Sequence, residues 1–179
     1  SLGEAQQFTF ESISALKNED GSVVSSSAIR ALLIDGNVEK VIPMFGRPYK
    51  TVGHVGYGDG RGASLGYPTA NITLVDELKL VPAPGVYAVK LLLTENGVPR
   101  KINGMLNYGL VPTIHKGGLQ EPRIEVNLFD YSESLREKTV EIEWFCRIRD
   151  EHCFASVEDL KLQLADDENV IRKFFIELK

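Results

Sequence analysis

The stretch LGYPTANITL, residues 65–74, places two small polar side chains directly behind a proline. Its second half alternates as a β-strand does, and a strand directs residues i and i+2 to one face. The hydroxyl of Thr69 and the amide of Asn71 would therefore point the same way. Both offer hard oxygen ligands, which Mg²⁺ prefers together with phosphate and water. A polar outer strand face would show the same pattern. Pro68 donates no ladder hydrogen bond and suits the start of the strand.

A second candidate for chemistry is Glu125, in the middle of RIEVNLF (residues 123–129). Apolar and polar residues alternate here, so Glu125 and Asn127 share the face opposite the apolar side chains. A carboxylate that faces a cleft can accept a proton from a hydroxyl. A carboxylate on a solvated face cannot serve in this way, and solvated positions are the commoner case. The neighbours of Glu125 in space decide between the two interpretations.

The segment GYGDGRG, residues 56–62, has glycine at every second position. It matches neither the Walker pattern nor the G-x-G-x-x-G dinucleotide fingerprint, and we expect no helix after it. Glycine at this density lets backbone N–H groups approach an anion closely. A flexible hairpin tip is the alternative, and composition alone favours it.

A charged stretch, Arg149-Asp150-Glu151, lies between the last expected strand and the final helix, with Phe154 just beyond. An arginine and a phenylalanine together could hold a flat aromatic ligand at the rim of a cleft. A charged surface loop is the alternative.

These candidate residues must be positioned by strands, because the sequence changes to strand and turn patterns after Gly46. We expect strands at residues 49–56, 69–75, 86–94, 100–106, 123–130 and 138–146. Glu95-Asn96-Gly97 predicts a tight hairpin between the third and the fourth. No strand–helix–strand rhythm appears, which argues against a parallel doubly wound sheet. Six short antiparallel strands predict a mainly β fold, a Greek-key barrel whose closure removes exposed edges.

Two short helices are expected before the barrel. Ser25, Ser26 and Ser27 offer N-caps for the first, which Asp35-Gly36 would stop. Asn37 would cap the second, and Pro43 and Gly46 would close it. Two helices of this length bury little surface alone, so we do not expect an independent domain.

A longer helix is expected at the C-terminal end of the barrel. Ser156 and Asp159 form an S-x-x-D cap at its start. Apolar residues recur after this cap at helical spacing, which predicts that the helix packs on the barrel. The stripe consists of Val157, Leu160, Leu164, Ile171, Phe174, Phe175 and Leu178.

Composition excludes several classes of protein. The formal net charge of the 179 residues is −5 and no basic patch is evident, which argues against a general nucleic-acid binder. No apolar run approaches the length of a membrane span, and the first residues do not resemble a secretory signal. Cys146 and Cys153 form no CxxC pair or zinc pattern, which favours a reduced, cytoplasmic setting. The three histidines are scattered along the chain.

Taken in order, five segments resemble the riboflavin kinase domain of bacterial bifunctional riboflavin kinase/FMN adenylyltransferases. They are GDGRGASLGYPTAN (58–71), PGVYAV (84–89), NYGLVPT (107–113), IEVNLFDY (124–131) and IRDEHCFASVEDLKLQLADD (148–167). The combination of G-x-PTAN with E-x-x-L-F-D is specific, whereas each piece alone is weak.

The resemblance also extends to the residues before the barrel. VSSSAIRALL, residues 24–33, resembles the end of the same proteins' adenylyltransferase domain, with Ser27 where threonine is common. The nucleotide-binding core of that domain lies upstream in the family and is absent from this sequence. The resemblance therefore implies a helical remnant at residues 1–46, unable to adenylylate FMN, and a kinase barrel at residues 47–179. The sequence would be a truncated piece or an unusually short version.

The resemblance implies a role for each candidate residue. Thr69 and Asn71 would hold Mg²⁺ against the phosphates, and Glu125 would take the proton from the 5′-hydroxyl of riboflavin. Arg149 and Phe154 would border the isoalloxazine ring. The nucleotide-binding set would be Gly60, Gly62, Gly66, Tyr67, Pro68 and Asn127, the last standing where relatives often have histidine.

The implied partners are small molecules, riboflavin and ATP, with Mg²⁺ as cofactor. The sequence indicates no nucleic acid, membrane or obligate protein partner. A small β-barrel that binds flavin or nucleotide without chemistry is the alternative, since such barrels also serve as binding modules.

Overall fold

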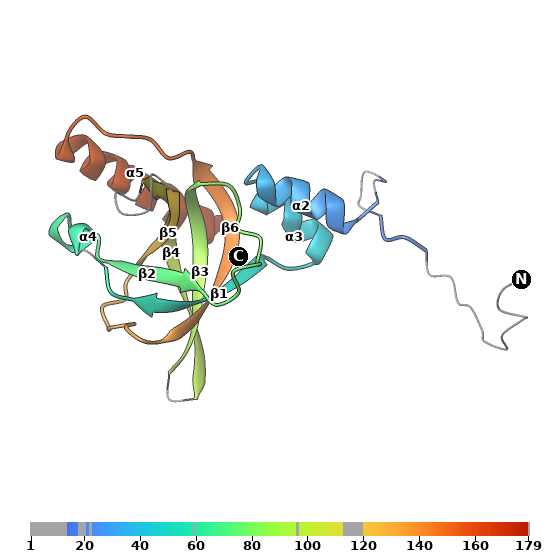
Figure 1. The fold of residues 1–179 in the computed structure, drawn as a ribbon, viewed down its shortest axis with the longest axis horizontal. Coiled ribbons are helices and arrows are strands. Elements are labelled where there is room, and N and C mark those ends of the chain that lie inside the picture. Colours follow the sequence, from blue (N-terminus) through green and yellow to red (C-terminus); the bar gives the residue numbers. More distant parts are fainter. Residues whose placement is uncertain are drawn as a thin grey trace, which may run out of the picture.

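The chain forms a closed six-stranded antiparallel barrel, in a computed structural model that describes residues 14–17, 21, 23–58, 60–95, 97–112 and 120–178 (Figure 1). The strands are β1 (Tyr49–Gly56), β2 (Thr69–Leu74), β3 (Gly85–Glu95), β4 (Val98–Pro112), β5 (Gln120–Leu128) and β6 (Thr139–Arg149). Their order around the barrel is β1-β2-β5-β4-β3-β6, in which β6 returns beside β3 after the β3-β4-β5 meander. This is a Greek-key arrangement, so the predicted fold class is confirmed.

Strand β4 is longer than predicted. The expected strand 100–106 becomes Val98–Pro112, because β4 keeps pairing with β5 as far as Pro112 opposite Gln120. The glycine and proline of NYGLVP weakened the strand signal there. The predicted hairpin turn joins β3 and β4, but Asn96 lies outside the described residues.

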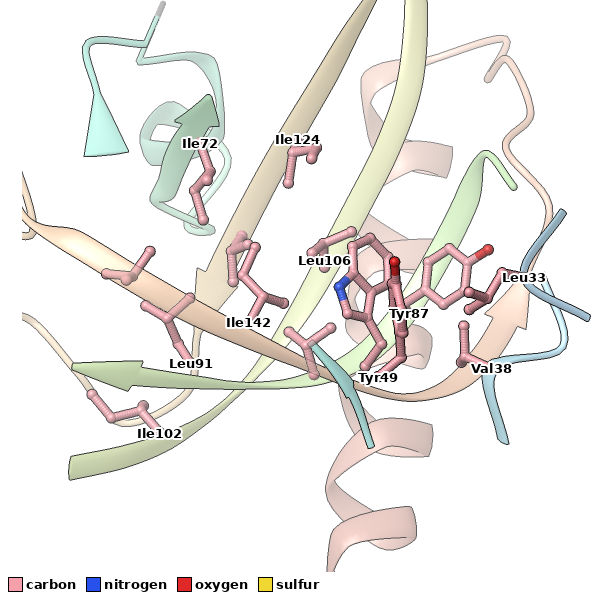
Figure 2. Close-up of a cluster of buried hydrophobic side chains, with 14 of the residues drawn as sticks. Leu33, Val38, Tyr49, Ile72, Tyr87, Leu91, Ile102, Leu106, Ile124 and Ile142 are labelled. Carbon is pink, nitrogen blue, oxygen red and sulfur yellow. The ribbon is translucent and has the colours of Figure 1, made fainter. Parts of the chain in front are cut away.

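The barrel interior is filled by the apolar residues of the alternating strands. Trp144 and Tyr87 are fully buried and meet edge to face, with ring centroids 5.0 Å apart. The indole Nε1 of Trp144 donates to Thr51 Oγ1 at 3.0 Å, so its polar atom is satisfied inside the core. Figure 2 shows this cluster, in which side chains of several strands converge. Ile124 and Val126 face inward as predicted, so Glu125 between them faces outward.

Two short helices pack on the barrel from the N-terminal side, α2 (Ser26–Ile34) and α3 (Val38–Phe45). Ser25 Oγ accepts from Ala28 N at 3.2 Å, which confirms one predicted N-cap. Val38 and Val41 are fully buried and belong to the same apolar cluster as the barrel interior. These helices therefore share the core of the barrel. Whether they are a remnant of an adenylyltransferase domain stays a prediction.

Pro43 does not close α3, contrary to our expectation. It lies inside the helix, which ends at Phe45, before Gly46 in the left-handed conformation (φ 66°). An interior proline removes one backbone hydrogen bond and strains a helix, but α3 continues for two residues beyond Pro43. Gly46 supplies the terminating conformation instead.

The C-terminal helix α5 (Val157–Glu177) covers part of the outer wall of the barrel (Figure 1). Ser156 Oγ accepts from Asp159 N at 3.0 Å, as the cap pattern predicted. Ile171 and Phe175 are buried against the wall. Val157 and Leu178 are about half exposed, so the predicted stripe is wrong at its two ends. These two residues lie beyond the helical turns that pack on the barrel.

A buried carboxylate ties three strands together on the outer wall. Glu143 of β6 is 3% exposed, and its oxygens lie 3.1 Å from the Nζ atoms of both Lys50 (β1) and Lys101 (β4). Burial raises the pKa of Glu143, but the hydrogen bonds from Lys101 and Lys50 outweigh burial and leave the pKa below its ordinary value of 4.5. The unfolded chain therefore binds a proton at this position more readily than the folded chain.

Replacing Glu143 with glutamine is expected to lower the free energy of unfolding at pH 7 by about 1.5–3 kcal/mol, the range for hydrogen bonds to charged groups. The wild-type advantage is present above pH 4.5 and disappears as the pH falls through the lowered pKa, because the carboxyl group then loses its charge. Urea unfolding at several pH values measures the difference. Glu77→Gln, at an exposed position, is the control. A difference that persists unchanged at pH 3 contradicts this account.

Candidate active site

One row of cross-strand neighbours crosses the outer wall of the barrel. Its members, in order from β2 to β6, are Asn71, Glu125, Asn107, Val86 and Arg149. Cross-strand neighbours share a face and have Cβ atoms roughly 5 Å apart. We call this set the polar row. It joins, in a single line, the predicted metal ligand Asn71, the predicted base Glu125 and the predicted flavin residue Arg149.

The next row supplies two further predicted residues. Thr69 of β2 pairs with Asn127 of β5, one step along the strands from Asn71 and Glu125. The structure thus brings Thr69, Asn71 and Glu125 together, although 54 positions separate Asn71 from Glu125 in the chain. Had β5 slipped by one residue relative to both β2 and β4, Glu125 would face the interior of the barrel.

A cleft of about 340 Å³ lies between this part of the barrel wall, helix α5 and the stretch after β6. Polar and apolar side chains both line it, which suits a ligand with a flat ring and a polar chain. Of the predicted residues, the cleft is lined by Gly62, Tyr67, Thr69, Glu125, Asn127, Arg149 and Phe154. Asn71 is absent from the lining and stands beside Glu125, at the edge of the cleft.

A second cavity of about 290 Å³ adjoins the first, and Thr69 lines both. Gly60 and Pro68 line this second cavity, whereas Gly66 lines neither. Its far side is formed by residues 131–136, YSESLR, which we did not single out from the sequence. Three hydroxyls and an arginine directly after E-x-x-L-F-D were the signal that could have identified this segment. Thr69 therefore lies at the boundary between the two cavities.

An arginine compensates the charge of Glu125. Arg123 Nη2 lies 3.2 Å from Glu125 Oε1 and donates to Asn71 Oδ1 at 3.4 Å. The guanidinium thus connects the predicted base to the predicted metal ligand. Asn127 has a structural contact, because its Nδ2 donates to the carbonyl oxygen of Pro68 at 2.8 Å and so fixes the entry into β2. Its predicted contact with nucleotide stays a prediction.

The glycine-rich segment lies close to the site because its glycines carry no side chains that would collide with it. A Cβ atom on Gly58 would overlap the amide of Asn71, and one on Gly62 would press on the carbonyl oxygen of Tyr67. A single helical turn, α4 (Arg61–Ser64), begins within the glycine-rich segment and extends past it, where we expected no helix. The turn closes because the backbone N–H groups of Leu65 and Tyr67 both reach Gly62 O.

Gly58→Ala is expected to displace the Asn71 amide and to reduce catalytic efficiency by up to about 10²-fold, the cost of a 1 Å misplacement in an active site. Glu77→Gln, at an exposed position outside both cavities, is the control. Steady-state kinetics of the activity proposed below measures the effect. Equal activity of the two variants would show that the close contact with Asn71 is unimportant.

The opposite end of the polar row is organised by a buried ion pair. Asp167 of α5 is 1% exposed and accepts from Arg149 Nε at 3.0 Å and from Arg149 Nη2 at 2.7 Å. Gln163 donates to the same carboxylate at 2.9 Å. The third guanidinium nitrogen of Arg149 donates to Asp150 O at 2.9 Å, and the guanidinium lies 5.8 Å from the ring centre of Phe154. The charge of Arg149 is therefore compensated, and its planar guanidinium is held in one orientation.

Asp167 was missed by the sequence analysis. An acidic residue in a helix that contains many charged residues gives no signal by its type. Its spacing was the available signal, because Leu164, Asp167 and Ile171 follow the i, i+3, i+7 pattern of the buried face. A carboxylate at a buried helical position requires a cationic partner.

The predicted metal ligands at this site are neutral oxygens. Among the described residues, no group of three or more His, Cys, Asp and Glu side chains could hold a metal ion. The hydroxyl of Thr69 and the amide oxygen of Asn71 suit Mg²⁺ when phosphate oxygens and water complete its coordination.

Cys146 and Cys153 are free thiols. Burial raises the pKa of the Cys146 thiol, and the negative charge of Glu39 raises it further.

Comparison with known proteins adds an independent line of observation. The family model described as "Flavokinase: Riboflavin kinase" matches residues 45–175. The bifunctional riboflavin kinase/FMN adenylyltransferase of Bacillus subtilis is 38% identical over 161 residues, which are 90% of this chain and 49% of that protein. The protein of the same name from Escherichia coli K12 is 37% identical over 158 residues, 88% of this chain and 48% of its own length. The chain spans about half the length of these relatives.

A solved structure is similar over most of the chain. The crystal structure of a Streptococcus pneumoniae protein named as a macrolide-efflux protein superposes with a TM-score of 0.78 at 37% identity. The match covers 89% of this chain and 50% of that one. Within the described part of this chain, no helix combines the length and the apolar character that crossing a membrane requires.

Proposed function

The chain belongs to the riboflavin kinase family, and from this membership we propose that it transfers the terminal phosphoryl group of ATP to the 5′-hydroxyl of riboflavin. The products are FMN and ADP. The observation that carries the proposal is the position of Glu125 beside Thr69 and Asn71, where two adjoining cavities meet. A phosphoryl transfer needs such a meeting point between an alcohol, a terminal phosphate and a proton acceptor.

The larger cleft is the proposed flavin site. From Glu125 to Arg149 the polar row crosses three strand spacings, or roughly 14 Å. This span suits a tricyclic ring with an extended five-carbon chain. The ring would lie at the end formed by Arg149 and Phe154, and the ribityl chain would run past Asn107 toward Glu125.

The smaller cavity is the proposed nucleotide site. Gly58 and Gly60 leave backbone groups accessible on one side, and the hydroxyl-rich residues 131–136 form the other. Backbone N–H groups and hydroxyls are the usual partners of phosphate oxygens where no Walker lysine is present. The terminal phosphate would then lie at Thr69, the residue common to both cavities.

The chemical step assigns one task to Glu125. Its carboxylate accepts the proton of the 5′-hydroxyl while that oxygen bonds to the terminal phosphorus and the bond from phosphorus to the ADP oxygen breaks. Arg123 holds the carboxylate in place during this transfer. Thr69 and Asn71 would hold Mg²⁺ against the phosphates, where the ion offsets the charge that develops on the phosphate oxygens.

Incubation of the protein with riboflavin, ATP and Mg²⁺, followed by chromatographic detection of FMN, tests the proposal. FMN formation that depends on both ATP and the protein is the expected result. Tight flavin binding without FMN would favour the non-catalytic binding module instead. We further propose that this chain does not adenylylate FMN, because its matched family is that of the kinase. FAD formation from FMN and ATP would overturn that part.

We place this reaction in the cytoplasm, with small molecules as its partners. Both cysteines of the chain are free thiols, as is usual in a reducing compartment. The negative net charge of −5 gives no electrostatic reason for a nucleic-acid partner.

A further inference from the structure

Asn107 stands next to Glu125 in the polar row and has a carboxylate partner of its own. The two residues pair directly across β4 and β5, and both line the larger cleft. Asn107 Nδ2 donates to Glu151 Oε1 at 2.9 Å. Glu151 belongs to the stretch that follows β6 and also lines the cleft. None of the roles assigned above to the predicted residues accounts for this pair.

A glycine in β4 leaves space for the Glu151 carboxylate. A Cβ atom at Gly109 would overlap Oε1 of Glu151 and approach its carboxyl carbon to 2.7 Å. Gly109 lies two residues after Asn107 and therefore on the same face of the strand. The Glu151 carboxylate therefore lies against the backbone at Gly109, beside the Asn107 amide from which it accepts a hydrogen bond.

The partner determines which end of the Asn107 amide faces the substrate. An ionised carboxylate only accepts hydrogen bonds, so the amide must direct its NH₂ group to Glu151. The carbonyl oxygen Oδ1 is then turned away from Glu151. Without Glu151 the amide could rotate and donate to the carboxylate of Glu125, which would occupy a lone pair that the base needs.

We propose that Asn107 is a specificity-determining residue that accepts a hydrogen bond from the secondary hydroxyl next to the reacting alcohol, and that Glu151 is its positioning residue. For riboflavin this group is the 4′-hydroxyl. The inference rests on the proposed function and deepens it. Glu125 and Asn107 offer two acceptors one strand spacing apart, which suits two hydroxyls on adjacent carbons. Fixing the 4′-hydroxyl orients the 5′-hydroxyl toward Glu125.

A substrate analogue without the 4′-hydroxyl provides the first test. The wild-type chain is expected to prefer riboflavin over 4′-deoxyriboflavin about tenfold or more, both in Kd from flavin fluorescence and in kcat/KM. In Asn107→Ala this ratio falls to near one, because the acceptor is gone for both ligands. Glu77→Gln leaves the ratio as it is. An unchanged ratio in Asn107→Ala overturns the assignment, and its melting temperature shows whether the variant is folded.

Exchanging donor and acceptor tests the role of Glu151. Asn107→Asp alone sets two carboxylates against each other and is expected to lose the preference for riboflavin. Adding Glu151→Gln restores a donor, so the double variant regains an oriented acceptor at position 107 and most of the preference. A double variant no better than Asn107→Asp overturns the positioning role.

The binding ratio keeps this inference separate from the proposed function. A wild-type chain that binds flavin but forms no FMN would overturn the kinase proposal, while the Kd ratio of riboflavin to 4′-deoxyriboflavin would still support or overturn the role of Asn107. A wild-type chain that forms FMN and binds both flavins equally overturns the inference alone.

Discussion

Replacing Glu125 with glutamine is expected to reduce FMN formation by about 10²–10⁴-fold, the usual contribution of a positioned general base. Glutamine has nearly the same shape, and its amide oxygen can still accept from Arg123, which lies 3.2 Å from the carboxylate in the wild-type chain. The amide cannot take up the proton of the attacking hydroxyl, so kcat falls. Chromatographic detection of FMN under saturating riboflavin and ATP measures the loss.

Two accompanying measurements make the Glu125→Gln result specific. Glu77→Gln removes a carboxylate at an exposed position after β2 and is expected to leave kcat unchanged. The Kd of Glu125→Gln for riboflavin is expected to stay within a few-fold of the wild-type value. If Glu125→Gln forms FMN at the wild-type rate, Glu125 has no part in the chemistry and the proton must leave by another route.

Removing Asp167 is expected to produce the largest loss of stability. Asp167→Ala leaves Arg149 without its bidentate partner, although the Arg149 side chain is only 19% exposed. An uncompensated charge of this kind costs roughly 3–5 kcal/mol of unfolding free energy. Urea unfolding measures the loss, and flavin fluorescence measures the accompanying loss of riboflavin affinity. Asp166→Ala is the matched control at the exposed neighbouring position, where a change within about 0.5 kcal/mol is expected.

A double variant separates stability from binding at this ion pair. Arg149→Met with Asp167→Leu replaces two charges by apolar side chains of similar size, which often restores stability. Riboflavin affinity is expected to stay low, because the oriented guanidinium beside Phe154 is lost. If the double variant binds riboflavin as well as the wild-type chain does, Arg149 supports the helix but does not contribute to the flavin site.

Residue alternation accounts for most of what the sequence predicted about the site. The pattern in RIEVNLF correctly directed Ile124 and Val126 inward and therefore Glu125 outward. The hydroxyl and amide of PTAN share a face for the same reason. These predictions succeed because side-chain direction in a strand depends on its period of two and does not require knowledge of the partner strand.

Pairing between distant segments explains what was missed. Residues 131–136 and Asp167 carry only weak local signals, the hydroxyls after E-x-x-L-F-D and the i, i+3, i+7 spacing, and Glu151 was noticed only as part of a charged stretch. Each acquires its place from a partner far away in the chain, as Glu151 does from Asn107, 44 positions earlier. The prediction of the α5 stripe was wrong at its ends for a related reason. Helical periodicity does not show where the contact between the helix and the barrel stops.

Local spacing along the chain is enough to predict a mainly β chain with a final capped helix, and the side of each strand that carries polar groups. The folded chain alone shows that β2 lies beside β5 in a register that aligns Asn71 with Glu125, and that α5 forms one side of the cleft next to them. The physical reason is that register and helix docking depend on the total burial of both partners, which alternation along one segment does not specify.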